Sequence, residues 1–523
     1  MQNHSLSHDS AVLIIGGSLV GLSAALFLAR RGVATIVIEK HHDSAPHPRA
    51  MGFTERTMEH YRAAGIGERI AQVPPQARLR RVRADSLTGA WRQETEWTPG
   101  ETQERRASAS PCGGAAIAQD SLEPILRSAA TQQGADLRLG HELLSFQQDD
   151  QGVTAQVRVR DSGALVTLRA AYLIGADGAA SPVRTALGIE RQGIGHLRTL
   201  RSILFRCPGA EPYLARGITQ FDIEQPGFKC FLTTYGDGRW ALMFDQTQPV
   251  GDDLVALVRR ALGQDLAVEV LATGCWELAG RIADRFSRGR VFLAGDAAHQ
   301  LPPTRGGFGA NTGIDDAANL AWKLAMVVQA RSSPLLLDTY DEERRPIAWL
   351  RHQQTFARPD YAHWAKGTLE HVALFGNEAM ELGQLQRSAA IPGAAAGLPP
   401  AAHPDQWAGQ PGTRIPHVWV EGGGSTLSTL DLATDGFVLL ARARGWIDAA
   451  RARTGPAWPL RALQVGVDIV FPADASFEHR FGVGADGAVL VRPDALIAWR
   501  ASGLPADPAR TLAEAMKQVA MLA

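Results

Sequence analysis

An apolar stretch near the N-terminus, interrupted by small residues, constrains the fold of this chain most strongly. Residues 11–29 are hydrophobic enough for a membrane span or a signal peptide, but the polar leader 1–10 contains no Lys or Arg. Glycine and serine also divide the stretch, which favours a strand, a tight turn and a helix over one continuous span. The expected elements are a strand at 12–15, a turn at 16–21, a helix at 22–31 and a second strand at 35–39.

Such a βαβ unit binds the diphosphate of a dinucleotide at the N-terminus of its helix. The turn reads G-x-S-x-x-G, so that Ser18 stands between Gly16 and Gly21 where a second glycine is usual. A serine there still admits the phosphates and adds a hydroxyl. Glu39 ends the second strand, where the adenosine ribose is expected, and an acid at this point suits the unphosphorylated ribose of FAD or NAD.

A second motif, at residues 290–313, places an acid and a glycine-rich turn between a strand and a helix. We expect a buried strand at 291–294 with Asp296 at its end, followed by Gly306, Gly307 and Gly309 and a helix that begins near Asn311. The free N–H groups of a helix N-terminus suit a reduced flavin, which becomes anionic on its pyrimidine side. Asp296 can accept hydrogen bonds from ribityl hydroxyls, so the motif indicates a flavin.

A third motif lies in between, at residues 171–188. A strand at 172–176 is followed by the Asp177-Gly178 turn, and Ser181-Pro182 is typical of a helix start. By itself, Asp177 would be interpreted as a turn residue.

In this order, the three motifs resemble those of the FAD-dependent aromatic hydroxylases, the single-component flavoprotein monooxygenases similar to para-hydroxybenzoate hydroxylase. The resemblance covers most of residues 8–375 and is closest to bacterial hydroxylases of aromatic polyketides such as anthracyclinones. It implies an α/β fold with a Rossmann-like FAD-binding domain. It also implies that the enzyme takes electrons from transiently bound NADPH or NADH. Dioxygen would then be captured as a flavin C4a-hydroperoxide that hydroxylates a phenolic or polycyclic aromatic substrate.

The same resemblance implies roles for individual residues. Arg49 would contact the cofactor and influence its mobility, the Pro303 carbonyl would face the substrate, and the Asp177-Gly178 turn would take part in the contact with nicotinamide. The catalytic candidates are Arg49, Pro303 and Tyr235. The implied cofactor-binding residues are Gly16, Ser18, Gly21, Glu39, Lys40, Arg49, Gln119, Asp177, Gly178, Gly295, Asp296, Pro303, Gly307, Gly309, Ala310 and Asn311.

Residues 189–276 change in character toward strands. Segments 201–206, 229–235 and 239–245, with a Gly236-Asp237-Gly238 turn, predict an antiparallel sheet. In the resembling family this sheet supplies the substrate pocket, for which the candidates are Phe231, Tyr235, Trp240 and Met243. Ionising a phenol would activate it, and Tyr235, Asp245, His299 or a chain of waters could accept the proton. For His299 a structural role is the commoner one.

The predicted organisation has three folded parts. They are an FAD-binding domain at 1–188 plus 277–388, a substrate-binding sheet at 189–276 that could include strands around 75–118, and a thioredoxin-like domain at 425–523 after a linker at 389–424. A helix is expected at 335–358. In the last part we expect strands at 436–440, 463–467 and 488–494 and a helix at 508–521. Thioredoxin chemistry is excluded, because no cysteine follows Cys275. A structural or oligomerisation role remains.

Composition narrows the possible partners. The chain has 523 residues, 45% hydrophobic and 20% charged, with a formal net charge of −1, so we expect a globular protein without a polyanionic partner. Arg78, Arg80, Arg81 and Arg83 have no aromatic residues between them and are not expected to bind nucleic acid. The four cysteines are scattered, which favours free thiols in the cytoplasm and no metal site. We expect no membrane span, a small aromatic substrate, and a monomer or homodimer.

Two other functions remain open at this point. The same flavin chemistry could carry out a Baeyer–Villiger oxygenation or an epoxidation of a polycyclic ketone or quinone. The chain could also bind flavin without turnover.

Overall fold

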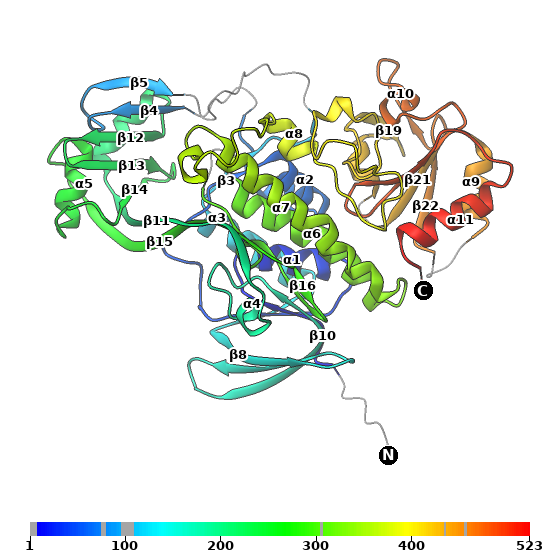
Figure 1. The fold of residues 1–523 in the computed structure, drawn as a ribbon, viewed down its shortest axis with the longest axis horizontal. Coiled ribbons are helices and arrows are strands. Elements are labelled where there is room, and N and C mark those ends of the chain that lie inside the picture. The colour runs from blue at the N-terminus through cyan, green and yellow to red at the C-terminus, as the bar shows by residue number, and fades with distance from the viewer. Residues whose placement is uncertain are drawn as a thin grey trace.

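The computed structural model describes residues 8–74, 80–95, 109–303, 307–433, 436–453 and 458–522. Three parts lie in a row: a sheet with one helix, a central α/β part, and a C-terminal part in yellow to red (Figure 1). Arg78, Gly306 and parts of the 75–118 segment, all named in the sequence predictions, lie outside the described residues.

The central part is built on a parallel sheet, which confirms the predicted α/β fold class. Its strands run in the order β16-β17-β10-β1-β2-β7, and β17, β10, β1, β2 and β7 are parallel. β8 and β9 extend β10 as an antiparallel hairpin. The bounds are β1 Ser10–Ile15, β2 Thr35–Glu39, β7 Asp136–Leu139, β8 His141–Gln148, β9 Val153–Val159, β10 Leu165–Gly175, β16 Ser287–Arg288 and β17 Val291–Leu293.

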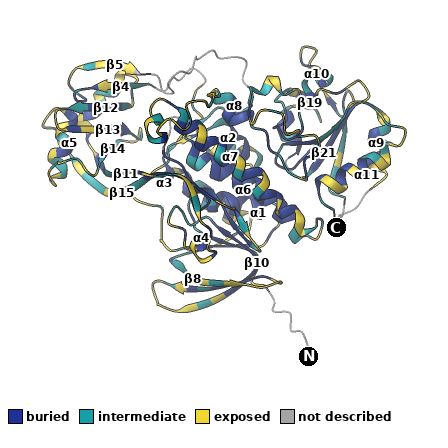
Figure 2. Cartoon of the chain, in the orientation of Figure 1, coloured by how far each residue is buried: buried dark blue, intermediate teal, exposed yellow. Residues whose placement is uncertain are grey.

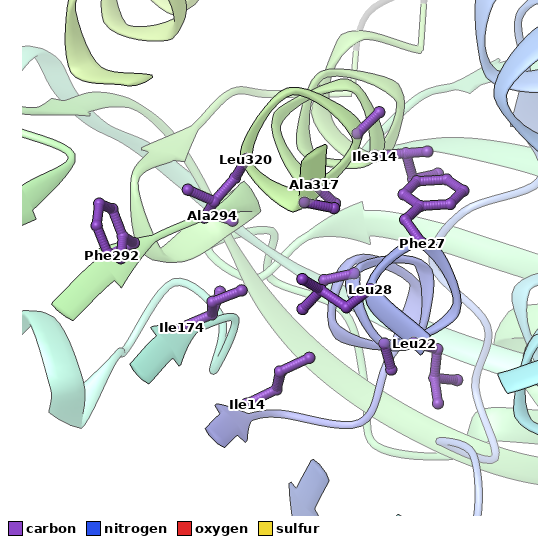
Figure 3. Close-up of a cluster of buried hydrophobic side chains, with 14 of the residues drawn as sticks. Ile14, Leu22, Phe27, Leu28, Ile174, Phe292, Ala294, Ile314, Ala317 and Leu320 are labelled. Carbon is purple, nitrogen blue, oxygen red and sulfur yellow. The ribbon is translucent and has the colours of Figure 1, made fainter. Parts of the chain in front are cut away.

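Two apolar helices cover this sheet and form the core of the molecule. Leu28 of α1 (Leu19–Ala29) faces Ala317 of α6 (Phe308–Val328), and Leu320 of α6 lies beside Ala294, which follows β17 (Figure 3). Both helices begin three residues earlier than expected. Ser18 and Gly307 explain this, because Ser18 has extended backbone and Gly307 is left-handed at φ 60°, so that each marks the end of its turn.

The other central elements surround these helices. They are β3 Gly52–Phe53, α2 Glu55–Ala63, β6 Ala115–Ala116, α3 Gln119–Gln132, α4 Pro182–Ala186, α7 Thr339–Ala357 and α8 Asn377–Leu382. The predicted helix at 335–358 is divided, because a 3-10 turn at Pro334–Leu337 precedes α7. As predicted, Ser181 caps α4 by accepting the N–H of Arg184 at 2.9 Å.

The second sheet is largely antiparallel, as predicted, and has the strand order β18-β15-β11-β14-β13-β12-β4-β5. Helix α5 (Leu254–Leu262) packs on one face of it, and the long strands β11 and β15 connect it to the centre. Its strands are β4 Arg81–Ala84, β5 Trp91–Thr95, β11 Arg191–Arg206, β12 Gln220–Gln225, β13 Phe228–Thr234, β14 Arg239–Asp245, β15 Glu269–Ala283 and β18 His299–Gln300.

The C-terminal part has the strand order of thioredoxin. Parallel β21 and β22 are connected through α9, and antiparallel β24 and β25 complete the sheet in the order β22-β21-β24-β25, followed by α11. A small sheet, β20-β19-β23, lies beside it. The bounds are β19 Trp419–Gly422, β20 Ser425–Ser428, β21 Phe437–Ala441, α9 Arg444–Arg451, β22 Leu460–Gln464, β23 Ile469–Val470, α10 Phe477–Phe481, β24 Ala488–Val491, β25 Ile497–Ala501 and α11 Pro508–Val519.

A buried ionic cluster joins the C-terminal part to the centre. The Glu343 carboxylate on α7 accepts hydrogen bonds from Arg492 at 2.8 and 2.9 Å and from Lys323 of α6 at 2.9 Å. All three side chains are fully buried. Removing one partner of such a pair leaves an uncompensated buried charge, at a cost of about 3–5 kcal/mol. The cluster therefore fixes the C-terminal part against α6 and α7.

Burial follows this architecture. The central helices are buried, whereas the β8–β9 hairpin is mostly exposed or half-buried (Figure 2). Within the described ranges, no helix combines the length and apolar character needed to cross a bilayer. The same residues contain no group of three or more His, Cys, Asp or Glu side chains placed to hold a metal ion.

Candidate active site

A cavity of about 3850 Å³ extends from the central part to the substrate sheet. It brings together residues that are far apart in the sequence. The predicted site residues that line it are Ser18, Arg49, Gln119, Gly178, Phe231, Tyr235, Met243, Asp296, Pro303, Gly307, Gly309 and Ala310. Among the described residues, those predicted but not found in its wall are Gly16, Gly21, Glu39, Lys40, Asp177, Trp240, Gly295 and Asn311.

The glycines of the first turn shape the site without lining it. Gly16 has φ +105°, and a Cβ atom there would lie 2.3 Å from the carbonyl oxygen of Ala176. A Cβ atom on Gly21 would lie 1.8 Å from the Gly16 carbonyl oxygen. Any side chain at either position would therefore force the turn away from β10 or from the start of α1.

Ser18 and Gln119 are connected to each other and to the Arg49 segment. The Ser18 hydroxyl donates to Glu123 at 2.6 Å and accepts from the Gln119 amide at 3.0 Å. The Gln119 carbonyl oxygen accepts the backbone N–H of Arg49 at 3.4 Å and of Ala50 at 3.3 Å. The first turn, α3 and the Arg49 segment thus form one wall, in which Glu123 was not predicted from the sequence.

Glu39 and Lys40 follow the second strand, just outside the cavity. Glu39 accepts the Gly17 N–H at 2.7 Å and the His41 N–H at 2.8 Å, so its carboxylate lies at the first turn, where ribose hydroxyls could also reach it. Lys40 is exposed, and its carbonyl accepts a hydrogen bond from Arg160 at 2.9 Å.

The N-terminus of α6 opens into the cavity. The described residues provide no side-chain cap for this 21-residue helix, and the space where a Cβ atom of Gly309 would point is empty. Its first N–H groups therefore remain available to an anionic ligand. The side-chain oxygen of Asn311 accepts hydrogen bonds from the Thr54 N–H at 3.0 Å and from the Thr57 hydroxyl at 2.6 Å. These bonds fasten the helix to the 52–57 segment, so a contact of Asn311 with a ligand would have to come from its backbone.

Asp296 and His299, close in sequence, have different surroundings. Asp296 is half-buried in the cavity wall, within a 3-10 turn at Gly295–Ala297. His299 is fully buried, and its Nε2 is 2.6 Å from Asp316, which also accepts a hydrogen bond from Arg344 at 2.8 Å. Because His299 does not reach the cavity, the structure favours a structural role for it over proton transfer.

The Asp177-Gly178 turn exposes only its glycine to the cavity. Asp177 Oδ2 accepts the Val183 N–H at 3.0 Å, and Oδ1 has no hydrogen-bond partner among the described residues. Burial raises the pKa of this carboxyl. A ligand at this turn would contact the backbone of Gly178, beside which there is open space.

The hydroxyl of Tyr235 makes a hydrogen bond within the protein. It donates to the Pro48 carbonyl at 2.7 Å, and the Arg239 guanidinium lies 5.4 Å from the centre of the ring. Burial raises the pKa of Tyr235 above its usual range. A phenol that donates to a carbonyl and keeps its proton is a poor base, so this geometry favours a positioning role.

The substrate sheet presents alternate residues to the cavity. Phe231 and Met243 are register partners on β13 and β14, and both line the cavity. Trp240 lies three residues before Met243 and therefore points to the opposite face. It is fully buried against α5, and its Nε1 donates to Glu211 at 2.8 Å. The expectation that Trp240 lines the pocket was therefore wrong.

Further wall residues were not predicted from the sequence. Leu200, Trp276 and Leu278 lie on β11 and β15, and strand alternation could have indicated them. Tyr361 and Trp364 follow α7, where the sequence carries no recognisable motif.

These features fit FAD. An uncapped helix N-terminus, open space beside Gly178 and Gly309, and a half-buried Asp296 in the same wall provide the donors and the acceptor that a flavin and its ribityl chain require. Leu200, Phe231, Met243, Trp276 and Leu278 provide apolar surface on the facing sheet that suits an aromatic ligand.

Comparison with known proteins agrees with this geometry. Residues 9–355 match the FAD binding domain family, and residues 408–520 match the family described as aromatic-ring hydroxylase, C-terminal.

Two relatives match along almost their whole length. The tetracenomycin B2 monooxygenase-dioxygenase of Streptomyces olivaceus is 39% identical, over 96% of this chain and 97% of that protein. The 4-methyl-5-nitrocatechol 5-monooxygenase of a Burkholderia species is 38% identical, over 97% of each. A solved ternary complex of aklavinone-11 hydroxylase with FAD and aklavinone has a TM-score of 0.87 at 35% identity, over 99% of this chain and 100% of that one.

Proposed function

This chain belongs to the FAD-dependent aromatic-ring hydroxylases, and on that premise we propose that it oxygenates a polycyclic phenol of the aromatic-polyketide type. It is a flavoprotein monooxygenase that uses NAD(P)H and dioxygen. The relatives named for tetracenomycin B2 and aklavinone support a polycyclic substrate, whereas the nitrocatechol relative acts on a smaller molecule.

The observation that carries the proposal is the shared cavity. Its wall includes Asp296 and Pro303 on the central side and Phe231 and Met243 on the sheet side. The cavity of about 3850 Å³ also continues along the C-terminal part at His417 and Arg480, and between Asp296 and Phe231 it joins the region proposed for the flavin to the substrate sheet.

Residues in the wall, together with Glu39 just outside it, would bind different parts of the cofactor and substrate. Asp296 would accept the ribityl hydroxyls, Glu39 the ribose hydroxyls, and the first N–H groups of α6 would stabilise negative charge on the pyrimidine edge. When bound, FAD supplies the electron transfer from nicotinamide and the activation of dioxygen. Phe231, Met243 and Leu200 would orient the aromatic ring and exclude water from the reacting atoms.

Proton transfer has fewer candidates than the sequence suggested. Tyr235 and His299 are engaged elsewhere, which leaves Asp245 or a chain of waters. Asp245 lines the cavity. Partial burial opposes ionisation there, but hydrogen bonds from Thr247 prevail and lower the pKa of Asp245. Its carboxylate is therefore ionised near neutral pH, but a lowered pKa makes it a weak base toward a phenol, which favours the chain of waters as the proton acceptor.

The test is substrate-dependent NAD(P)H oxidation, followed by mass analysis of the product. We expect a phenolic polycycle to stimulate oxidation and to gain one oxygen as a ring hydroxyl, with either NADPH or NADH as donor. A ring-expanded lactone or an epoxide from a ketone or quinone would support the alternative chemistry. No stimulation by any of these compounds would reject the proposed substrate class.

Location and assembly belong to the same proposal. A cytoplasmic enzyme is supported by the four cysteines, all of which are free thiols. We also propose a monomer or homodimer, which light scattering of the purified protein would test.

A further inference from the structure

The cavity has a C-terminal arm, whose wall comes from the C-terminal part of the chain and has no role in the proposed reaction. The wall of this arm includes His417, Val418, Trp419, Pro472, Asp474 and Ala475. The regions proposed for the flavin and for the aromatic substrate belong to the same cavity. An aromatic molecule that enters the cavity can therefore also meet the C-terminal arm.

Trp419, the first residue of β19, provides an exposed aromatic ring in this arm. It is 46% exposed, whereas Trp240, Trp322 and Trp446 are fully buried. The next residue, Val420, is buried in a small apolar cluster, so strand alternation turns Trp419 to the opposite face of β19. A tryptophan is mostly apolar ring with one polar N–H, and it therefore offers apolar surface to a flat aromatic ligand.

The ring of Trp419 is held in place by neighbours that are themselves fixed. The Arg62 guanidinium of α2 lies over the ring, 6.0 Å from its centroid, and Asp431 accepts two hydrogen bonds from that guanidinium at 2.8 and 2.9 Å. The His417 ring packs against Trp419 in a T-shaped arrangement, with centroids 5.0 Å apart. Arg62 and Asp431 are not part of the cavity wall, so they support the indole ring without occupying the arm.

The polar groups beside this ring favour an uncharged ligand. Burial lowers the pKa of His417 to about 4, so its ring is neutral near neutral pH. Asp474 is exposed in the same wall, and it lies close to Trp419 because Val418 and Ala475 pack in one apolar cluster. An anionic ligand would be repelled by the Asp474 carboxylate, whereas a hydroxyl group on a neutral ring system could donate a hydrogen bond to it.

We propose that the C-terminal arm is a second binding site for a planar, uncharged polycyclic aromatic molecule, which packs against the exposed surface of Trp419. The identity of this ligand rests on the proposed function, since the molecule would be the phenolic polycycle that the enzyme oxygenates. The C-terminal part would thus bind the substrate at a place separate from the flavin, in addition to the structural role expected from the sequence.

The test counts the binding sites for 2-hydroxyanthraquinone on the FAD-loaded enzyme in the absence of NAD(P)H. Equilibrium dialysis measures all bound probe, whereas flavin absorbance responds to probe beside the flavin. We expect two bound molecules per wild-type chain, one of which perturbs the flavin. Trp419→Ala should raise the Kd of the other site about tenfold and leave the flavin-detected Kd unchanged. Trp419→Phe keeps an aromatic ring and should retain most of the affinity.

Val470→Ala is the matched control. Val470 lies on β23, which pairs with β19, and it is 49% exposed but outside the cavity wall. Its replacement should change neither Kd. Equal weakening of the second site by Val470→Ala would indicate nonspecific adsorption to apolar surface, and would overturn the proposal.

The two measurements separate this site from the proposed function. One bound molecule per wild-type chain, detected by both methods, would overturn the second site and leave the proposed function standing. A second site with the same Kd in the wild type and in Trp419→Ala would also overturn it. If the probe binds only at a site that depends on Trp419, without perturbing the flavin or stimulating NAD(P)H oxidation, the proposed function fails and the aromatic site stands. Binding at neither place rejects both.

Discussion

The Tyr235 hydroxyl lies 2.7 Å from the Pro48 carbonyl and ties the hairpin of the substrate sheet to the segment that carries Arg49. The same segment is held on its other side by Gln119, which accepts the N–H groups of Arg49 and Ala50. Arg239 reinforces the hairpin through an ion pair with Asp120 at 2.5 Å, next to Gln119. Hydrogen bonds and an ion pair therefore connect the substrate sheet to the proposed flavin contact at Arg49.

Replacing Tyr235 by phenylalanine tests whether its hydroxyl positions the Arg49 segment or transfers a proton. Loss of one hydrogen bond to Pro48 costs about 1 kcal/mol, so we expect kcat/KM for the aromatic substrate to fall less than tenfold. A residue that transferred the proton would contribute roughly 10²–10⁴-fold. Steady-state kinetics of Tyr235→Phe, with FAD content as the control, distinguishes the two. A loss of more than a hundredfold at full FAD content would assign Tyr235 a catalytic role.

Asp296→Ala should weaken FAD binding. The substitution removes the proposed acceptor of the ribityl hydroxyls, and a hydrogen bond to a charged group contributes about 1.5–3 kcal/mol, or roughly 10–100-fold in Kd. The flavin-to-protein ratio after gel filtration measures the effect. Asp252→Ala is the matched control, since its side chain is 96% exposed and outside the cavity wall. Equal flavin content in the two variants would refute the role of Asp296.

Substitution of two aromatic residues of the substrate sheet should affect different quantities, KM for one and the free energy of unfolding for the other. Phe231→Ala removes apolar surface from the cavity, so KM for the substrate should rise about tenfold, with little change in stability. Trp240→Ala removes a fully buried ring on the other face, and should lower the free energy of unfolding by about 3–5 kcal/mol. Melting temperatures and KM values, measured on both variants, test this reciprocal pattern. A KM effect in Trp240→Ala at intact stability would contradict it.

Stability should fall with acid because of His352. Burial lowers the pKa of this histidine from 6.5 to about 4, and its Nε2 accepts the N–H of Ile194 at 3.3 Å. Because the pKa is lower in the folded state, the unfolded chain binds the proton first. The contribution of His352 to the free energy of unfolding is therefore fully present above pH 6.5. It decreases by roughly 3 kcal/mol as the pH falls toward 4.

Unfolding curves between pH 7 and 4.5 measure this dependence. His352→Gln has no proton to gain, and its amide oxygen can still accept the Ile194 N–H. The variant should therefore lose less stability than the wild type over this range. Parallel pH profiles of the two proteins would exclude His352 as the cause.

Local sequence rules predicted most of the elements. The turn at Gly16, the strand that ends before Asp296 and the cap at Ser181 are each marked by a short sequence pattern, and the structure contains all three. Strand alternation could also have separated Trp240 from Met243, since the two lie an odd number of residues apart. The error at Trp240 came from choosing residues by type without regard to this parity.

The sequence by itself determined the α/β class and the order of the motifs, because backbone geometry and short-range hydrogen bonds control these features, and the resemblance of those motifs to a known family implied the flavin chemistry. Only the tertiary structure decided which side chains share the cavity. Tyr235 reaches Pro48 across 187 positions, and Tyr361 reaches Pro303 across 58. His299 instead turns away from the cavity, toward Asp316. Such pairings depend on how the sheets and helices pack together, and no local pattern records them.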